Sequence, residues 1–402
     1  MGPEREAERE NRVDMTRRAV LRPSGQVAFP LTGWSRIHQR RGLSLWSIPL
    51  ALFSLCYRAG VWFRVKAYER GILKGNMLPG FVLSVGNITA GGTGKTPAVV
   101  TLGRWAVSEG LSVAILSRGY RGRYREDLLE VSDGRQIRTH AGEAGDEPFL
   151  LARAVPGSCV IVSKKRYLAG MYAHKKFGSD FFILDDGFQH LGLRRDLNLL
   201  LMDGTEPFGN GHLLPWGPLR EPLSQLGRAD AFILTRCRTD QGLGKGTAKD
   251  PVKRTRGFLT GRFPSIPQFC ADHIPDSLVF PVSGRIFEPA FLKGKKVMAF
   301  AGIARPEEFR HTLVRLGADL LEFREYRDHQ PLSVDDMAAL MRKKERVGAG
   351  YLVTTEKDWM RLAPLVQAHE DLAYLSIRFT FPAGQEGIFD MIKEAMVERE
   401  KG

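Results

Sequence analysis

Short apolar runs alternate with longer, helix-like segments from residue 81 to residue 235. Short runs of this kind are typical of buried strands, and their regular alternation with helices is typical of a mostly parallel sheet covered on its faces by helices. The expected strands are residues 81–85, 113–116, 159–162, 181–184, 197–202 and 231–234. The pattern therefore predicts an α/β fold.

A second series of strands and helices begins at Val297, after a stretch over 258–284 in which prolines and glycines make the pattern irregular. Its expected strands are 297–301, 320–323 and 351–354, and its expected helices are 306–317 and 333–347. This series resembles half of a doubly wound fold. Its loop at 302–306 lacks the G-x-G-x-x-G spacing, so we expect no dinucleotide site there.

The N-terminal part of the chain has a different character. Residues 1–33 are rich in Glu, Arg, Pro and Gly and show no apolar periodicity, which predicts a disordered extension reaching to about residue 40. The apolar segment Leu43–Phe63 follows, long enough to cross a hydrocarbon layer of about 30 Å. Pro49 and Arg58 disfavour a span, while Trp46 and Trp62 suit a helix lying in the membrane surface. Spanning, surface binding and a buried core helix remain open, and membrane contact is favoured.

Charge supports that preference. The chain of 402 residues carries a net charge of +14 with 43% hydrophobic and 26% charged residues, as expected for a globular protein with an acidic partner. Eight Lys and Arg against one acid lie between Trp34 and Gly75, around the apolar segment. The four cysteines are far apart and form no C-x-x-C pair, which indicates neither a zinc site nor a disulfide framework.

A glycine-rich stretch between the first expected strand and a helix carries the clearest chemistry. The stretch reads GNITAGGTGKTP from Gly86, and its residues Ala90, Gly91, Gly92, Thr93, Gly94, Lys95 and Thr96 form the expected phosphate-binding loop. Backbone N–H groups and the helix N-terminus hold phosphate oxygens in such loops. Lys95 is then expected at the β- and γ-phosphates of ATP, and the Thr96 hydroxyl on Mg²⁺. Thr89 occupies the place of the first glycine of the usual pattern, and the competing interpretation is a chance glycine turn.

A second motif follows the strand expected over 181–184, where the chain continues Asp185-Asp186-Gly187. A carboxylate after an apolar strand commonly holds Mg²⁺ beside such a loop, which predicts a metal role for Asp185 and its neighbour Asp186. The simpler alternative is an Asp-Gly turn after a core strand.

These motifs define a domain organisation in five parts. We expect a disordered extension (1–40), a basic and apolar membrane-associated helix (41–75), a three-layer nucleotide-binding domain with the phosphate loop (76–257), a connection (258–290) and a smaller Rossmann-like α/β domain (291–402).

Several sequence blocks, taken in order along the chain, resemble those of the tetraacyldisaccharide 4'-kinases, the lipid A kinases of Gram-negative bacteria. The blocks are SVGNITAGGTGKTP from Ser84, SRGYRG from Ser117, GDEP from Gly145, ILDDGFQH from Ile183, RRDLNLLLMD from Arg194, FGNGHLLPWGPLREP from Phe208, FAGIARPEEF from Phe300, RDHQPLS from Arg327 and TTEKDWMRL from Thr354. The loop of this family typically has the shorter glycine pattern seen here. The resemblance extends from about Trp46 to the C-terminal helix.

The resemblance implies a membrane-surface kinase with ATP and Mg²⁺ as cofactors. The γ-phosphate would pass to the 4'-hydroxyl of an acylated glucosamine disaccharide 1-phosphate on the cytoplasmic face of the bacterial inner membrane, forming lipid IVA. A basic, apolar N-terminal helix would give access to this acyl-chain substrate. No nucleic acid and no obligate protein partner is expected.

The resemblance also implies roles for individual residues. Asp146 in GDEP corresponds to the catalytic aspartate, and His329 in RDHQP to the histidine that pairs with it across the two domains. Arg220 would neutralise the transferred phosphoryl group, and Glu221 would help to hold Mg²⁺. Further candidates are Gln189 and His190 for the same site, and Arg118 and Arg121 for the substrate's 1-phosphate. The simpler alternatives are a helix cap for Asp146, a loop position for His329, a surface ion pair for Arg220 and Glu221, and a structural histidine for His190.

Three rival functions are disfavoured. A guanine-nucleotide switch needs an N/T-K-x-D motif, and neither Asn-Lys nor Thr-Lys occurs in the chain. A membrane-associated ATPase that regulates a partner generally has lysine where this chain has Ala90, yet it remains the alternative function. A nucleic-acid binder would carry its basic residues on an aromatic-laced strand surface rather than around an apolar helix.

Overall fold

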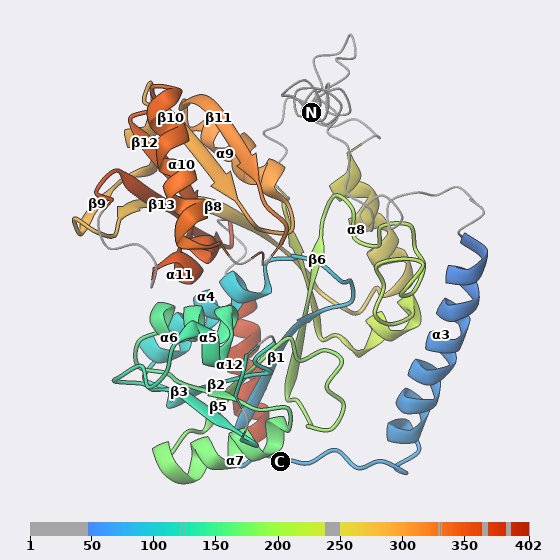
Figure 1. The fold of residues 1–402 in the computed structure, drawn as a ribbon. Coiled ribbons are helices and arrows are strands. Elements are labelled where there is room, and N and C mark those ends of the chain that lie inside the picture. Colours follow the sequence, from blue (N-terminus) through green and yellow to red (C-terminus); the bar gives the residue numbers. More distant parts are fainter. Residues whose placement is uncertain are drawn as a thin grey trace, which may run out of the picture.

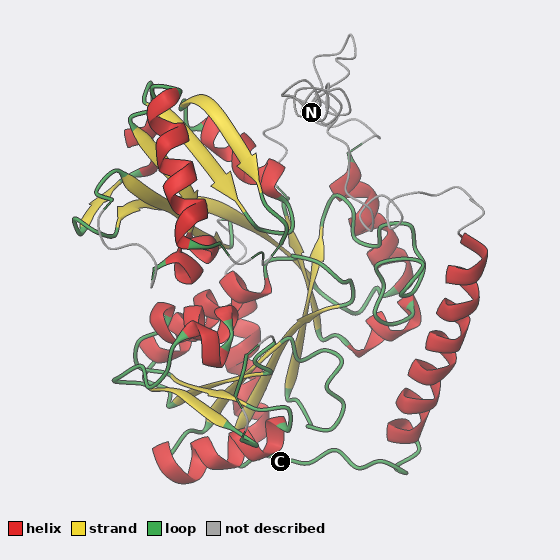
Figure 2. Ribbon diagram, in the orientation of Figure 1, coloured by secondary structure: helices red, strands yellow, loops and turns green. Residues whose placement is uncertain are grey.

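A computed structural model gives the fold, and it describes residues 47–120, 122–124, 126–237, 250–328, 330, 332–363, 369–382 and 387–401. Its strands form a single mixed sheet in the order β11-β10-β12-β13-β8-β7-β6-β1-β5-β2-β4-β3, with β9 paired to β8. Helices cover both faces of this sheet (Figures 1 and 2). The chain is thus a mixed α/β protein with a large, mostly parallel sheet. The disorder predicted for 1–40 falls outside the described residues.

The first part of the sheet is parallel except at its edge. Its strands are β1 (Phe81–Asn87), β2 (Val113–Ser117), β4 (Cys159–Val162), β5 (Phe181–Asp185), β6 (Leu197–Asp203) and β7 (Ala231–Thr235), with β3 (Leu129–Asp133) antiparallel at the edge. The six expected strands are confirmed. Strand β1 is central, with Val85 level with Asp185 of β5 on one side and Gly86 level with Leu200 of β6 on the other. The loop after β1 and the carboxylates after β5 therefore lie at the same edge of the sheet.

Helices of this part lie in two layers. Helices α4 (Lys95–Ser108), α6 (Asp146–Ala154) and α12 (Gly387–Lys401) share one apolar core, and α7 (Arg166–Phe177) covers the opposite face. The C-terminal helix α12 crosses back onto the first part of the chain, where Ile388 and Ile392 are fully buried in the same core as Val99 of α4. The remaining elements are α5 (Ala141–Ala144), η2 (Leu223–Arg228) and α8 (Pro251–Arg262).

The second part of the sheet belongs to the later series of elements. Its strands are β9 (Arg285–Phe287), β10 (Lys296–Ala301), β11 (Asp319–Glu325), β12 (Tyr351–Thr355) and β13 (Leu372–Thr380), and its helices are η3 (Pro289–Leu292), α9 (Pro306–Arg315), α10 (Val334–Arg346) and α11 (Glu356–Leu362). The three strands and two helices expected here are confirmed. Helix α10 begins at a capping box, in which the Ser333 and Asp336 side chains each accept from the other's backbone N–H.

The stretch 258–284, expected to be an irregular connection, contains the end of α8 and the long strand β8 (Gln268–Phe280). Its start pairs in parallel with β7, and the rest pairs antiparallel with β13, so one strand joins both parts of the sheet. Pro275 lies in this strand where the register with β13 shifts, a position at which a missing N–H is tolerated. This proline and the ones before the strand hid its pattern in the sequence.

Helix α3 (Ser47–Glu69) lies at one side of the protein, separate from the helical layers (Figure 1). It covers most of the predicted segment Leu43–Phe63 and continues beyond it, while residues 43–46 fall outside the described part. Among the described residues it is the one helix long and apolar enough to cross a membrane, with a mean hydropathy of 1.2 over an 18-residue window within Ile48–Glu69. Many of its large apolar side chains, including Phe53 and Phe63 at 66% exposure, face away from the protein.

Candidate active site

The glycine-rich loop joins β1 to α4 as predicted. Helix α4 begins at Lys95, and Gly94 before it has a left-handed backbone with φ of 86°. A Cβ at Gly94 would lie 2.3 Å from the imidazole of His273, which is on β8. Glycine is therefore required here both by conformation and by space. Desolvation lowers the pKa of the half-buried His273 to about 4, so it contacts the loop as a neutral ring.

Lys95, Asp186 and Arg220 converge at the end of this loop. The Lys95 ammonium lies 3.1 Å from Asn87 Oδ1 and 3.5 Å from Asp186 Oδ1. Arg220 donates from one nitrogen to both Asp186 oxygens, at 2.8 and 3.0 Å. Burial raises the pKa of Asp186, but Lys95 and Arg220 together outweigh it and lower that pKa below its usual value. Two cations thus face a single carboxylate where the sequence predicts the ATP phosphates.

Asp185 lies beside this group in a different environment. Its carboxylate is buried and accepts a hydrogen bond of 2.9 Å from the Ser117 hydroxyl of β2. Burial raises its pKa to about 7, with the Glu147 and Asp186 carboxylates adding to the effect. A buried carboxylate without a cation of its own suits a divalent metal, and Thr96 in the first turn of α4 offers the hydroxyl expected of this site. Among the described residues, no group of three or more His, Cys, Asp or Glu side chains is arranged to hold a metal ion.

We expect Asp185→Asn to stabilise the protein in magnesium-free buffer. The folded pKa near 7 exceeds that of an unfolded aspartate, about 3.9, so the folded state binds a proton more tightly. Stability must then fall as pH rises from about 4 to about 7, and asparagine removes that loss. Thermal unfolding should show a higher midpoint for Asp185→Asn at pH 8 and a smaller gain at pH 5.

The exposed residue Asp180 provides the control, since Asp180→Asn should leave the midpoint unchanged at both pH values. Added Mg²⁺ and ATP should stabilise the wild type more than Asp185→Asn. An Asp185→Asn variant that is less stable than the wild type at pH 8 would contradict both the electrostatic argument and the metal assignment.

Glu221 follows Arg220 in the chain but does not join the cluster around Asp186. Its carboxylate is fully buried, with one oxygen 3.0 Å from Arg64 of α3 and the other paired with Arg228. The predicted metal role of Glu221 therefore has no contact to support it, and the structure gives the residue an ion-paired position against α3 that the sequence did not indicate.

Asp146 lies at the first position of α6 and faces the second part of the protein. Its carboxylate is 3.4 Å from Nε of Arg361, which belongs to α11. The residue before the helix is Gly145, and no side chain caps this helix end, so the helix-cap interpretation of Asp146 does not hold. Arg361 also donates to the backbone carbonyl of Gln330 at 3.5 Å. His329 lies outside the described residues, but the segment around it thus approaches the residue that contacts Asp146.

The chain matches known proteins over most of its length. The family model described as Tetraacyldisaccharide-1-P 4'-kinase matches residues 46–396. The chain belongs to this family. A tetraacyldisaccharide 4'-kinase of Syntrophus aciditrophicus is 42% identical over 345 residues, covering 86% of this chain and 92% of the relative. One from Geobacter metallireducens is 41% identical, covering 79% of this chain and 89% of the relative. The solved structure of LpxK from Aquifex aeolicus in complex with ATP is 31% identical, with a TM-score of 0.67, and covers 88% of this chain and 99% of that one.

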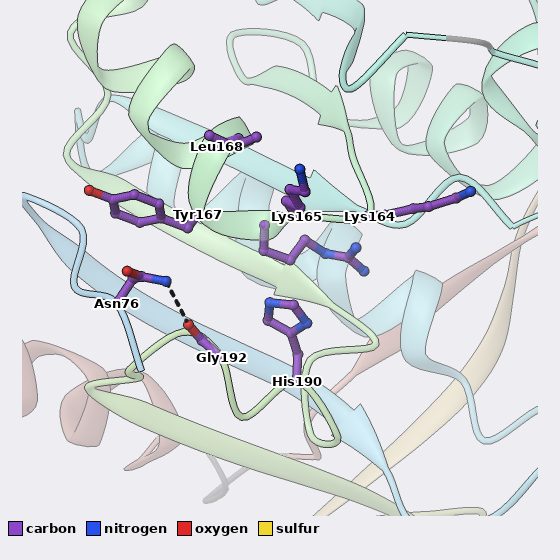
Figure 3. Close-up of a pocket in the computed structure, with 8 residues that line it drawn as sticks. Asn76, Lys164, Lys165, Tyr167, Leu168, His190 and Gly192 are labelled. Carbon is purple, nitrogen blue, oxygen red and sulfur yellow. Dashed lines mark hydrogen bonds between the residues drawn. The ribbon is translucent and has the colours of Figure 1, made fainter. Parts of the chain in front are cut away.

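This member of the tetraacyldisaccharide 4'-kinase family also has a basic cavity of about 330 Å³ (Figure 3). It is lined by Asn76, Lys164, Lys165, Arg166, Tyr167, Leu168, His190 and Gly192, and none of these carries a carboxylate. The figure shows His190 across the cavity from Lys165. Burial and the charges of four arginines, beginning with Arg166, together lower the pKa of His190 to about 4. The cavity therefore suits an anion.

The candidate residues Gln189 and His190 lie at different sites, one at the phosphate loop and the other at the basic cavity. The Gln189 amide donates to the backbone carbonyl of Asn87 at 2.8 Å, so it faces the phosphate loop, whereas His190 faces the cavity. Arg166 is almost fully buried and links the sites by donating to the backbone carbonyl of Asp185 at 3.2 Å. Arg118 lies after β2 and Arg121 lies outside the described residues.

Sequence reasoning missed a further buried carboxylate in this kinase. Asp203 at the end of β6 pairs with Arg236 at 2.5 Å and with Arg305 at 2.8 Å. Burial opposes its ionisation, but the two arginines outweigh burial and lower its pKa to about 2. Arg236 also approaches the carbonyl of Gly92 in the phosphate loop at 3.5 Å. The available signal was the apolar run 197–202 ending in Asp203, the same pattern that identified Asp185.

Proposed function

We propose that this kinase transfers the γ-phosphoryl group of ATP to the 4'-hydroxyl of a tetraacylated glucosamine disaccharide 1-phosphate, on the cytoplasmic face of the inner membrane. The observation that carries the proposal is the convergence of Lys95 and Arg220 on Asp186, at the sheet edge where the loop after β1 meets the carboxylates after β5. Within the family that the comparisons show, this is a site for phosphate chemistry.

The residues then act in the following way. Backbone N–H groups of residues 90–96 and the N-terminus of α4 hold the ATP phosphates. Lys95 and Arg220, which face one carboxylate in the structure, offset the charge that develops on the transferred phosphoryl group. Thr96 and Asp185 would hold Mg²⁺, and this ion would supply neutralisation of the phosphate charge when bound. Asp146 accepts the proton of the sugar hydroxyl, with His329 as its partner.

We assign the two parts of the sheet to two functional domains. The part from β1 to β7 is a three-layer nucleotide-binding domain, and the later series is the smaller Rossmann-like domain. Arg361 reaches Asp146 and Arg305 reaches Asp203, so residues of the second domain already contact carboxylates of the first. Closure of the domains would bring the segment around His329 to the acceptor.

We propose that the 1-phosphate of the lipid acceptor binds in the basic cavity. Arg118 and Arg121 remain candidates for the 1-phosphate, but Lys164, Lys165 and the N-terminus of α7 surround a cavity without acidic residues. The exposed apolar side chains of α3 would rest in the lipid surface that holds the acyl chains.

Transfer of labelled γ-phosphate in detergent micelles tests the proposal directly. With Mg²⁺, ATP and tetraacyldisaccharide 1-phosphate, the wild type should yield a bisphosphorylated lipid, with the new phosphate at the 4'-position by phosphorus NMR. ATP hydrolysis without lipid phosphorylation would contradict the proposal and favour an ATPase that regulates a partner.

The cavity assignment predicts an effect on acceptor binding. We expect the double substitution Lys164→Ala and Lys165→Ala to raise KM for the lipid about tenfold, because phosphate loses two charge partners, with little change in kcat. Lys175→Ala, on the exposed side of the same helix α7, is the matched control and should behave as the wild type. An unchanged KM for the double variant would place the 1-phosphate elsewhere.

A further inference from the structure

One face of helix α3 is bonded to the segment that carries Arg220. The Ser54 hydroxyl donates to the carbonyl of Leu213 at 3.0 Å, the Tyr57 hydroxyl to the carbonyl of Arg220 at 2.9 Å, and Arg64 to the carboxylate of Glu221 at 3.0 Å. Positions 54, 57 and 64 recur at helical spacing and so lie on a single face. Exposed apolar side chains such as Leu52, Phe53 and Phe63 lie elsewhere on the helix surface, together with the exposed Arg58.

The same segment is bonded on its other side to the phosphate loop. The Arg220 N–H donates to the carbonyl of Ile88 at 2.8 Å, and the Ala90 N–H donates to the carbonyl of Pro218 at 2.6 Å. The Arg220 side chain then reaches Asp186. Residues 218–221 therefore lie between α3 and the phosphate loop. At Arg220 a single residue contacts both the helix and the site.

Glu221 fastens this layer to the helix. Its carboxylate is fully buried, and Arg64 and Arg228 supply the positive charges beside it. Arg228 in turn lies 4.6 Å from the ring centre of Phe188, in the segment that follows Asp185 and Asp186. Because a buried carboxylate that loses a partner is strongly disfavoured, Arg64 keeps α3 and Glu221 together.

We infer that Tyr57 and Arg64 are positioning residues for phosphoryl transfer, which hold Arg220 in place from the membrane-facing helix. The inference rests on the proposed function of Arg220. It adds that the contacts of α3 with residues 220 and 221 control the position of the Arg220 side chain. When α3 is seated, the hydrogen bond of Tyr57 fixes the backbone of Arg220, and the pair of Arg64 with Glu221 fixes the next residue. The kinase thereby reaches full activity only with its helix docked against this segment.

Tyr57→Phe tests the inference, because it removes the hydroxyl and keeps the ring. In the micelle assay we expect kcat to fall about 5- to 10-fold, as for the loss of one hydrogen bond, with KM for ATP unchanged. Tyr68→Phe is the matched control on the same helix, because the Tyr68 hydroxyl forms no hydrogen bond with the described residues, and it should leave kcat unaltered.

A double-mutant cycle separates positioning from general damage. In an Arg220→Lys background, Tyr57→Phe should cost nothing further, because it acts through Arg220. The same holds for Arg64→Met, while Arg64→Lys should recover part of the rate. Flotation with anionic vesicles should show Arg64→Met bound as well as Arg58→Met, which removes an equal charge from an exposed position of the helix.

Losses that multiply with Arg220→Lys, or equal losses for Tyr57→Phe and Tyr68→Phe, would overturn the inference while leaving the lipid kinase intact. A wild type that transfers no phosphate to the lipid would instead overturn the proposed function, so the two failures are distinguishable.

Discussion

Lys95→Ala is expected to lower kcat/KM for lipid phosphorylation by about 10³-fold or more while the protein remains folded. The Lys95 ammonium lies within 3.5 Å of Asp186 at the start of α4, so it is the cation nearest to the expected γ-phosphate on the loop itself. Its positive charge would act most strongly as negative charge shifts in the transition state. Radiolabel transfer in micelles measures the rate, and circular dichroism measures the fold.

Lys253→Ala on helix α8 is the matched control for this substitution, because Lys253 is exposed and far along the chain from the loop. It should leave both the rate and the spectrum unchanged. A Lys95→Ala protein that unfolds would make the lysine structural, and one that retains more than a tenth of the activity would refute the phosphate-loop assignment.

Much of the fold could be predicted because buried parallel strands have a plain sequence signature. Strands such as β5 (Phe181–Asp185) and β6 (Leu197–Asp203) are buried at every position, so they read as continuous apolar runs. The polar residue that ends such a run then marks the functional edge of the sheet, which located Asp185 and Asp186. The loop before Lys95 was equally readable, since its glycines are a local requirement of backbone shape.

The parts that could not be predicted depend on contacts between distant residues. Strand β8 was hidden because Pro275 disfavours a strand locally, and pairing with β13 at a register shift permits it there. The partner of Glu221 is Arg64, far earlier in the chain, and a buried ion pair leaves no pattern in the sequence. The same is true of Asp203, whose partner Arg305 follows the first strand of the second series.

These distant contacts have a common direction. Arg64 of α3 pairs with Glu221. From the second part of the chain, Arg305 pairs with Asp203 and Arg361 pairs with Asp146. Arginines from α3 and from the second part of the chain thus lie around the phosphate loop and Asp146. Local motifs define the chemistry of the site, and these long-range ion pairs define its assembly.

Asp146→Asn and His329→Ala are each expected to lower kcat by about 10²- to 10³-fold, and the double variant by less than the product of the two losses. Asp146 is the acid at the start of α6, and Arg361 joins it to the carbonyl of Gln330, next to His329. Groups that act as one unit lose their function together, so removal of either should leave little for the second substitution to remove. His311→Ala, on an exposed position of α9, is the matched histidine control and should keep the wild-type kcat. Losses that multiply fully would show that the two residues act independently. ATP binding should be measured in parallel, because it distinguishes a variant that lacks the proton acceptor from one that no longer binds ATP.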